Sequence, residues 1–173
     1  MRRKDREITD MNEIVEIMKK CDTCRLAIND PEGYPYIVPL NFGFDFEDEQ
    51  LYLYFHSAKE GKKLDLMKLD PRVTFEMDTS HQIILYVERM SCTMGYESII
   101  GRGMVEEVED QMMGLKIIMR QFHSEDFVFN TKLVPATYVF RVKVQSITGK
   151  RRDNIHPEEK TKYTIDLNPS DHK

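Results

Sequence analysis

The sequence contains no tryptophan and only three cysteines among its 173 residues. Cys21, Cys24 and Cys92 leave one thiol over in any pairing, so a scaffold held together by disulfides is not expected. An odd, small number of thiols is typical of a reducing compartment, and we therefore expect a cytoplasmic protein.

Long apolar runs and an excess of positive charge are also missing. No stretch reaches the roughly 18 apolar residues that a membrane-spanning helix needs. The charged start, MRRKDREITD, is not followed by the apolar segment of a secretory signal. The formal net charge of -5 argues against the basic surface that nucleic acid requires. We therefore expect neither a membrane partner nor a nucleic-acid partner.

Apolar residues make up 40% of the chain, which is enough for a buried core. The length suits one compact domain. We place this single domain at residues 1–150 and expect a polar C-terminal tail over residues 151–173.

Alternation of apolar and polar residues predicts strands along most of the chain. Strands are expected at residues 23–30, 34–46, 51–57, 72–78, 81–90, 96–110 and 136–150, and helices at 10–20, 61–70 and 110–123. Asp10, followed by Glu13, has the spacing of a capping box at the first helix. Short connections favour antiparallel pairing. The predicted fold class is mainly β: a small, Greek-key-like antiparallel barrel with peripheral α-helices.

The stretch YFHSAKEGKKLD, residues 54–65, joins the end of a predicted strand to the start of a predicted helix. A helix N-terminus offers free backbone N–H groups to an anion, and a glycine lets the backbone approach it closely. The side chains that add donors or charge here are His56, Ser57, Lys59, Lys62 and Lys63, beside Gly61. This pattern predicts a phosphate site, with a solvated lysine-rich loop as the alternative.

The strand before this corner contains YIVPLNFG, residues 36–43. Pro39 cannot donate to a strand ladder, which leaves neighbouring backbone groups free to meet a planar ligand, and Asn41 adds an amide. The alternative is an edge strand that proline protects from aggregation.

Three blocks, in this order, carry a resemblance to a known family. They are GYPYIVPLNFGF at residues 33–44, LYLYFHSAKEGKKLDLMKLDPRVTFEMD at 51–78 and GYESIIGRGMVEEVED at 95–110. Over residues 5–150 the chain resembles the pyridoxamine 5'-phosphate oxidase-like superfamily of FMN-binding split barrels. Within it, the chain is most similar to the nitroimidazole-resistance (Nim-type) flavoproteins.

The resemblance implies a homodimer with FMN in a groove at the subunit interface. The segment implied to lie along the isoalloxazine and ribityl chain comprises Val38, Pro39, Leu40 and Asn41. The residues implied to take the phosphate and ribityl hydroxyls are His56, Ser57, Gly61, Lys62 and Lys63. The block Tyr96, Glu97 and Ser98 matches a segment that reaches the cofactor site.

The same resemblance implies a catalytic role for His56, which occupies the position of a histidine beside the flavin in Nim-type proteins. The family's oxidases carry a Ser-Arg-Lys motif where this chain has Glu60-Gly61-Lys62, so Ser57 or Lys63 must compensate. Counterparts of the residues that grip pyridoxamine phosphate are not evident. Oxidation of vitamin B6 is therefore not expected.

The remaining chemical signals are weak. Cys21 and Cys24 form a single CxxC, but a redox pair of the thioredoxin type would open a helix after a strand, and zinc would need more ligands. We expect Cys92 to be a buried, inert thiol, with a thiol that tunes a flavin as the alternative. The other histidines show no ligand spacing, so no metal site is predicted.

These observations leave two main hypotheses of different classes. One is an FMN-dependent oxidoreductase that passes electrons from a donor such as NAD(P)H to a small electrophile, for example a nitroimidazole or another nitroaromatic. The other is a flavin carrier or redox sensor without catalysis. A relative that uses the same barrel for haem or the deazaflavin F420 is a third.

Overall fold

The computed structural model describes residues 3–87, 90–124, 126–132 and 134–152, and the backbone of residues 164–166. The chain forms two compact units. The first unit comprises Met1–Lys20, Asp78–Ile99 and Thr148–Lys173, and the second comprises Cys21–Met77 and Ile100–Ile147. The prediction of a polar tail over residues 151–173 falls mostly outside the described residues.

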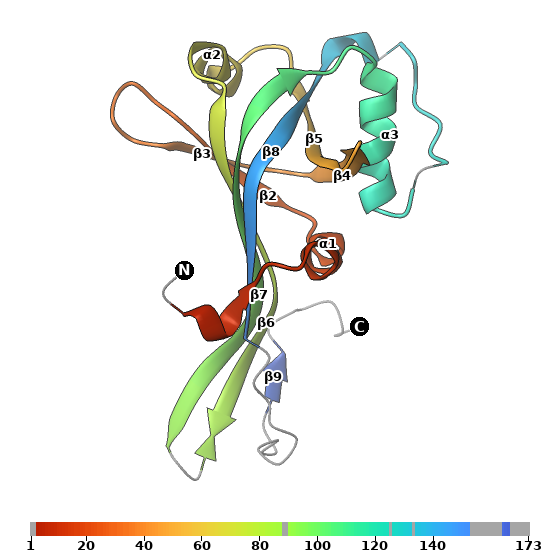
Figure 1. The fold of residues 1–173 in the computed structure, drawn as a ribbon. Helices are drawn as coiled ribbons and strands as arrows, with labels where there is room; N and C mark the ends of the chain where they lie inside the picture. The colour runs from red at the N-terminus through yellow and green to blue at the C-terminus, as the bar shows by residue number, and fades with distance from the viewer. Residues whose placement is uncertain (1–2, 88–89, 125, 133, 153–163, 167–173) are drawn as a thin grey trace. The chain divides into compact units, whose positions relative to one another are not determined.

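Strands dominate the described chain, with a few short helices (Figure 1). The helices are η1 (Lys4–Arg6), α1 (Met11–Lys20), α2 (Lys62–Leu69), α3 (Gln111–Gln121) and η3 (Val134–Ala136). The strands are β1 (Glu7–Ile8), β2 (Cys24–Ile28), β3 (Tyr36–Leu40), β4 (Phe42–Glu47), β5 (Gln50–Ala58), β6 (Arg72–Tyr86), β7 (Ser91–Glu107), β8 (Thr137–Arg152) and β9 (Thr164–Asp166).

The strands form one sheet in the order β3-β2-β6-β7-β8-β5-β4, with β1 beside β8 and β9 beside β6. The pairs β2–β3, β2–β6, β4–β5 and β5–β8 are antiparallel. This arrangement confirms the predicted mainly β fold of the split-barrel class.

Two predicted strand boundaries are wrong. The strand expected at residues 34–46 is two strands, because the chain leaves the ladder at Asn41, whose amide donates to the carbonyl of Asp22 at 3.0 Å. As a result β3 and β4 lie at opposite ends of the strand order. The strands expected at 72–78 and 81–90 are the single strand β6, which continues through Ser80 although its φ is 58°.

The first unit packs α1 through one apolar stripe, as the spacing of its residues predicts. Ile14, Ile17 and Met18 are buried. Asp10 accepts the backbone N–H of Glu13 at 3.0 Å, which confirms it as the cap. The Glu13 carboxylate binds Arg151 instead of closing a capping box.

The second unit buries α3 against β4 and β5. The cluster beneath α3 includes Tyr54, Ile117 and Val139, and Asp110 caps the helix by accepting the N–H of Met113. On β5 and β8, Phe55 and Phe140 stack with their ring centroids 5.3 Å apart. Buried packing therefore holds β5 in place, and the Asp110 cap sets the first residue of α3.

We expect Gly43→Ala to destabilise the second unit. A methyl group at Gly43 would overlap the backbone of Ile117 and Ile118 in α3, which cannot yield as the tip of a side chain can. The expected loss is about 2 kcal/mol of unfolding free energy, measured by chemical denaturation. Gly33→Ala is the matched control, since its φ of 93° is strained but its surroundings are open. A loss no larger than that of the control would contradict the close packing of α3 on β4.

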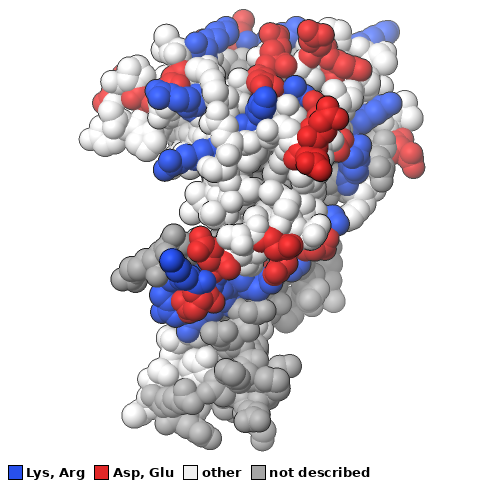
Figure 2. Space-filling model, in the orientation of Figure 1, with Lys and Arg blue, Asp and Glu red and all other residues white. Residues whose placement is uncertain are grey.

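Basic and acidic side chains are interspersed over the face shown in Figure 2, without one continuous basic surface. This distribution agrees with the acidic composition. Within the described residues, the helices are all too short or too polar to cross a membrane.

Candidate functional site

The predicted phosphate corner lies between the end of β5 at Ala58 and the start of α2 at Lys62. Gly61 is the N-cap of α2 and has φ 129°, a conformation that other residues rarely adopt. A Cβ at Gly61 would meet no atom within 4 Å. No side chain caps the helix. The N–H of Leu64 donates to the Gly61 carbonyl at 2.9 Å, so the N–H groups of Lys62 and Lys63 are the ones that an anion would use.

The Lys62 side chain is held by the turn between β2 and β3. Its Nζ lies 2.8 Å from Oδ2 of Asp30, whose side chain is only 6% exposed. The Lys62 Nζ also lies 5.5 Å from the ring centroid of Tyr36. The Lys62 hydrogen bond lowers the pKa of Asp30, and the same bond raises the pKa of Lys62. A second carboxylate, that of Glu32, lies 4.0 Å from the same Nζ. Lys62 is therefore held as a cation at the corner, and its three N–H donors allow it to keep the bond to Asp30 while it donates to another acceptor.

Lys63 and Ser57 are both half-buried beside this corner. The Ser57 hydroxyl donates to the carbonyl of Ala58 at 2.7 Å, so it must rotate before it can donate to a phosphate.

His56 lies at the end of β5, opposite Val139 of β8. Its side chain is exposed, yet the surrounding protein removes enough water to lower the pKa of the imidazole below its ordinary value. At pH 7 the imidazole is therefore neutral. Successive strand residues point to opposite faces, so His56 shares a face with Tyr54, whereas Ser57 shares the other with Phe55. His56 and Ser57 are therefore neighbours at one strand end, but their side chains lie on opposite faces of the sheet.

The residues predicted to line a planar ligand belong to β3 and its end. Val38 and Leu40 are half-buried on one face, while Pro39 is exposed on the other. Pro39 pairs with Arg25 on a strand that has one neighbour, β2, in the sheet order. Tyr36 shares the face of Val38 and Leu40, and Lys62 Nζ lies near its ring. The face of β3 that carries Val38 and Leu40 is therefore the one on the side of Lys62. Asn41 is exposed, with one amide proton on Asp22.

Tyr96 and Ser98 belong to the first unit, whereas the other predicted site residues belong to the second. Both are half-buried on β7. Burial opposes ionisation of the Tyr96 phenol, but Lys150 and Arg6 outweigh it and lower the phenol pKa.

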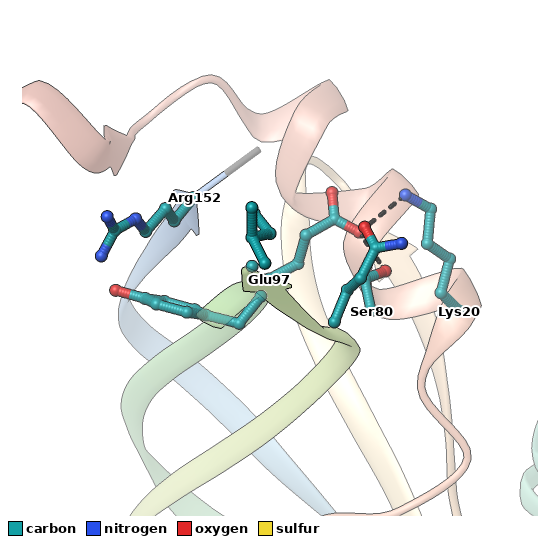
Figure 3. Close-up of a pocket in the computed structure, with 8 residues that line it drawn as sticks. Lys20, Ser80, Glu97 and Arg152 are labelled. Carbon is teal, nitrogen blue, oxygen red and sulfur yellow. Dashed lines mark hydrogen bonds and ion pairs between the residues drawn. The ribbon is translucent and has the colours of Figure 1, made fainter. Parts of the chain in front are cut away.

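Between these two residues, Glu97 is the buried charged residue of the described chain (Figure 3). Its carboxylate accepts from Lys20 Nζ, Ser80 Oγ and Arg151 Nε, each at 2.8 Å. Burial raises the pKa of Glu97, but these three donors outweigh it, so the net pKa lies below the ordinary value. Glu97 therefore stays ionised and joins α1, β6 and β8 within the first unit.

Sequence reasoning did not identify Asp30, Tyr36 or the role of Glu97. Asp30 was readable only as a turn residue, since it also accepts the N–H of Glu32 at 3.0 Å. No spacing rule connects it to Lys62, 32 positions along the chain in sequence numbering. Such pairs form only when the β2–β3 turn and α2 are brought together by folding.

The cysteines agree only in part with expectation. Cys21 and Cys24 are buried, and burial strongly raises the pKa of the Cys24 thiol, which makes it a poor nucleophile. Cys92 is exposed, so its predicted burial is wrong; it is the second residue of β7. Among the described residues, no group of three or more metal-ligating side chains could hold a metal ion.

Comparison with known proteins gives the family. The family described as pyridoxamine 5'-phosphate oxidase matches residues 10–151. The chain therefore belongs to the pyridoxamine 5'-phosphate oxidase-like family. No curated protein sequence matches it.

Solved structures include a proposed 5-nitroimidazole antibiotic resistance protein from Bacteroides thetaiotaomicron. It is 33% identical, with a TM-score of 0.72, over 83% of this chain and 85% of that one. The FAD and heme binding protein from Mycobacterium smegmatis is 14% identical, with a TM-score of 0.71, over 89% and 78%. The flavocytochrome Anf3 from Azotobacter vinelandii is 14% identical, with a TM-score of 0.68, over 88% and 72%. The last two share the fold alone with this chain.

Proposed function

We propose that this protein is an FMN-dependent oxidoreductase that reduces a small electrophile, such as a nitroimidazole or another nitroaromatic. The observation that supports it best is the corner at Gly61 and Lys62, where open space, helix N–H groups and a fixed cation coincide. Family membership and the 33% identity to a proposed 5-nitroimidazole resistance protein point to the same chemistry.

The residues of the corner fit a phosphate monoester. In the proposed arrangement, the backbone at Gly61 and the first turn of α2 donate to its oxygens, and Lys62 and Lys63 compensate its charge. Lys62 can keep its bond to Asp30 while it donates a second proton. Val38, Pro39, Leu40 and Asn41 would flank the ring system, and Tyr96 and Ser98 would reach it. Bound FMN would supply the electron transfer.

His56 is the proposed catalytic residue. Because its pKa is lowered, at pH 7 it would orient and polarise the acceptor through a neutral N–H rather than as an imidazolium. The electron donor in this proposal is NAD(P)H. A second copy of the chain would complete the site in a cytoplasmic homodimer, which the molecular mass in solution would test.

The test begins with the purified full-length chain and added FMN. We expect a yellow protein with a two-band visible spectrum, followed by NAD(P)H oxidation coupled to loss of a nitroimidazole. A chain that takes up no FMN would refute the flavin assignment. FMN binding without turnover on any nitroaromatic or quinone would refute only the reductase.

That last outcome is the signature of the second candidate, a flavin carrier or redox sensor. Its contacts with the flavin would be the same, and only the role of His56 would differ. Slow reoxidation of the reduced flavin in the presence of every acceptor would support this role.

We expect Lys62→Ala to weaken FMN binding by about 1.5–3 kcal/mol, because a hydrogen bond to a charged group is lost. Fluorescence titration of FMN measures the change. Lys68→Ala, on the same helix and exposed, is the matched control and should bind as the unaltered protein does. Equal affinities of the two variants would place the phosphate elsewhere.

A further inference from the structure

The first unit contains a cavity of about 370 Å³, and Tyr96 is the one residue of its lining that is also proposed to reach the flavin. Its lining includes Lys20, Ser80, Gln82, Tyr96, Glu97 and Arg152 (Figure 3). Cavities of this size hold small ligands. The lining contains one buried carboxylate, Glu97, and two cations, Lys20 and Arg152. Which of these charges are already paired therefore decides the charge of the ligand that fits.

Two buried donors in this unit lack partners. The Nε atoms of Arg6 and Arg152 are the buried side-chain nitrogen or oxygen atoms without a hydrogen-bond partner in the part of the chain described. Buried polar groups are almost always paired, so each such exception calls for a ligand, an ion or a water. Arg152 lines the cavity itself.

Both arginines are associated with Tyr96. Arg6 and Lys150 lower the pKa of its phenol, and Lys150 Nζ lies 5.3 Å from its ring centroid. Arg152 shares the cavity wall with Tyr96. Arg6 and Lys150 therefore lie beside Tyr96, and Arg152 lines the cavity together with it.

The nearby carboxylates are already engaged. Glu97 binds Lys20 and Arg151, and Figure 3 shows Arg152 on the opposite side of Glu97 from Lys20, with no interaction drawn to it. Asp5 lies 3.9 Å from Arg6 Nε but binds Arg3 at 2.6 Å. Among the described side chains, no carboxylate is seen to pair with Arg152, so its guanidinium is the cation in the lining that is left for a ligand.

We propose that the Tyr96 end of this cavity binds an oxyanion, the carboxylate or phosphate group of a small molecule, through Arg6, Lys150 and Arg152. A guanidinium presents parallel N–H donors that match the two oxygens of such a group. Ile84, which also lines the cavity, offers an apolar contact for the rest of the molecule. All of these residues belong to the first unit, and the proposal does not rest on flavin binding.

The test is an NMR titration of the ¹⁵N-labelled full-length chain with benzoate, inorganic phosphate and benzamide. Benzamide has the shape of benzoate without its charge. We expect benzoate, phosphate or both to shift the amides of Gly95 and Tyr96 with a Kd on the order of 1 mM or below, and benzamide to shift neither. The responding anion identifies the carboxylate or the phosphate as the preferred group. No response to either anion, or an equal response to benzamide, would overturn the proposal.

Variants test the residues. Arg152→Gln should weaken binding of the responding anion about tenfold or more, and Arg152→Lys should restore part of it, because the charge returns without the parallel donors. Arg102→Gln, an exposed arginine of the second unit, is the control and should bind normally. If Arg152→Gln does not fold, Lys150→Gln serves in its place. Unchanged affinity in these variants would overturn the proposal, and so would competition between FMN and the anion, which would assign the cavity to the flavin.

Discussion

His56→Ala is expected to lower the turnover of a nitroaromatic acceptor about 10²–10⁴-fold, the usual contribution of a positioned acid–base group. FMN affinity should change far less, because the phosphate donors at Gly61, Lys62 and Lys63 remain in place. Stopped-flow reoxidation of the reduced flavin by the acceptor separates this chemical effect from binding. The prediction rests on the position of His56 at the end of β5, exposed and facing away from Ser57.

The pH profile distinguishes the two ways in which His56 could act. If the imidazolium donates a proton, activity rises as the pH falls through a pKa below about 6.5. If the neutral imidazole polarises the acceptor, activity is constant above that pKa and falls as the pH drops through it, because the neutral form is lost. His56→Gln retains an N–H donor and would rescue only the second mechanism. His81→Ala, at an exposed histidine of the first unit paired with Asp78, is the control. Turnover of His56→Ala equal to that of the control would remove His56 from the chemistry.

Helices and strands were predictable where the local spacing of apolar residues is enough to determine them. The stripe of Ile14, Ile17 and Met18 determines α1, and the aromatic run before His56 determines β5. The break at Asn41 and the continuity of β6 were not predictable, because both depend on long-range pairing. Asn41 leaves the ladder to bind Asp22, and β6 continues through Ser80, which bonds to Glu97.

The candidate site shows the same division. Gly61 and the lysines of the corner could be read locally, because a strand end, a glycine and a helix start are adjacent in sequence. The Asp30–Lys62 pair and the cations around Tyr96 could not, since their members come from distant segments. Sequence therefore predicts the donors of the phosphate corner, while only the fold reveals what orients them.

Glu97→Ala is expected to destabilise the first unit by about 3–4 kcal/mol of unfolding free energy. Its removal leaves Lys20 and Arg151 without their shared carboxylate and Ser80 without an acceptor. Lys20 is half-exposed and can turn to water, which keeps the loss toward the lower end of the range for a broken buried ion pair. Urea denaturation at pH 7 measures it, with Glu16→Ala as control, because the Glu16–Lys19 pair is exposed.

The acid dependence of stability tests the same group independently. The folded pKa of Glu97 lies below its unfolded value, so its contribution is fully present above a pH of about 4.3 and is lost as the pH falls through the folded pKa. The stability difference between the unaltered protein and Glu97→Ala should therefore be constant near neutrality and shrink in acid. Glu97→Gln keeps the shape and should behave as Glu97→Ala does, since a neutral amide cannot compensate two cations. A difference that persists unchanged into strong acid would mean that Glu97 acts through packing and not through its charge.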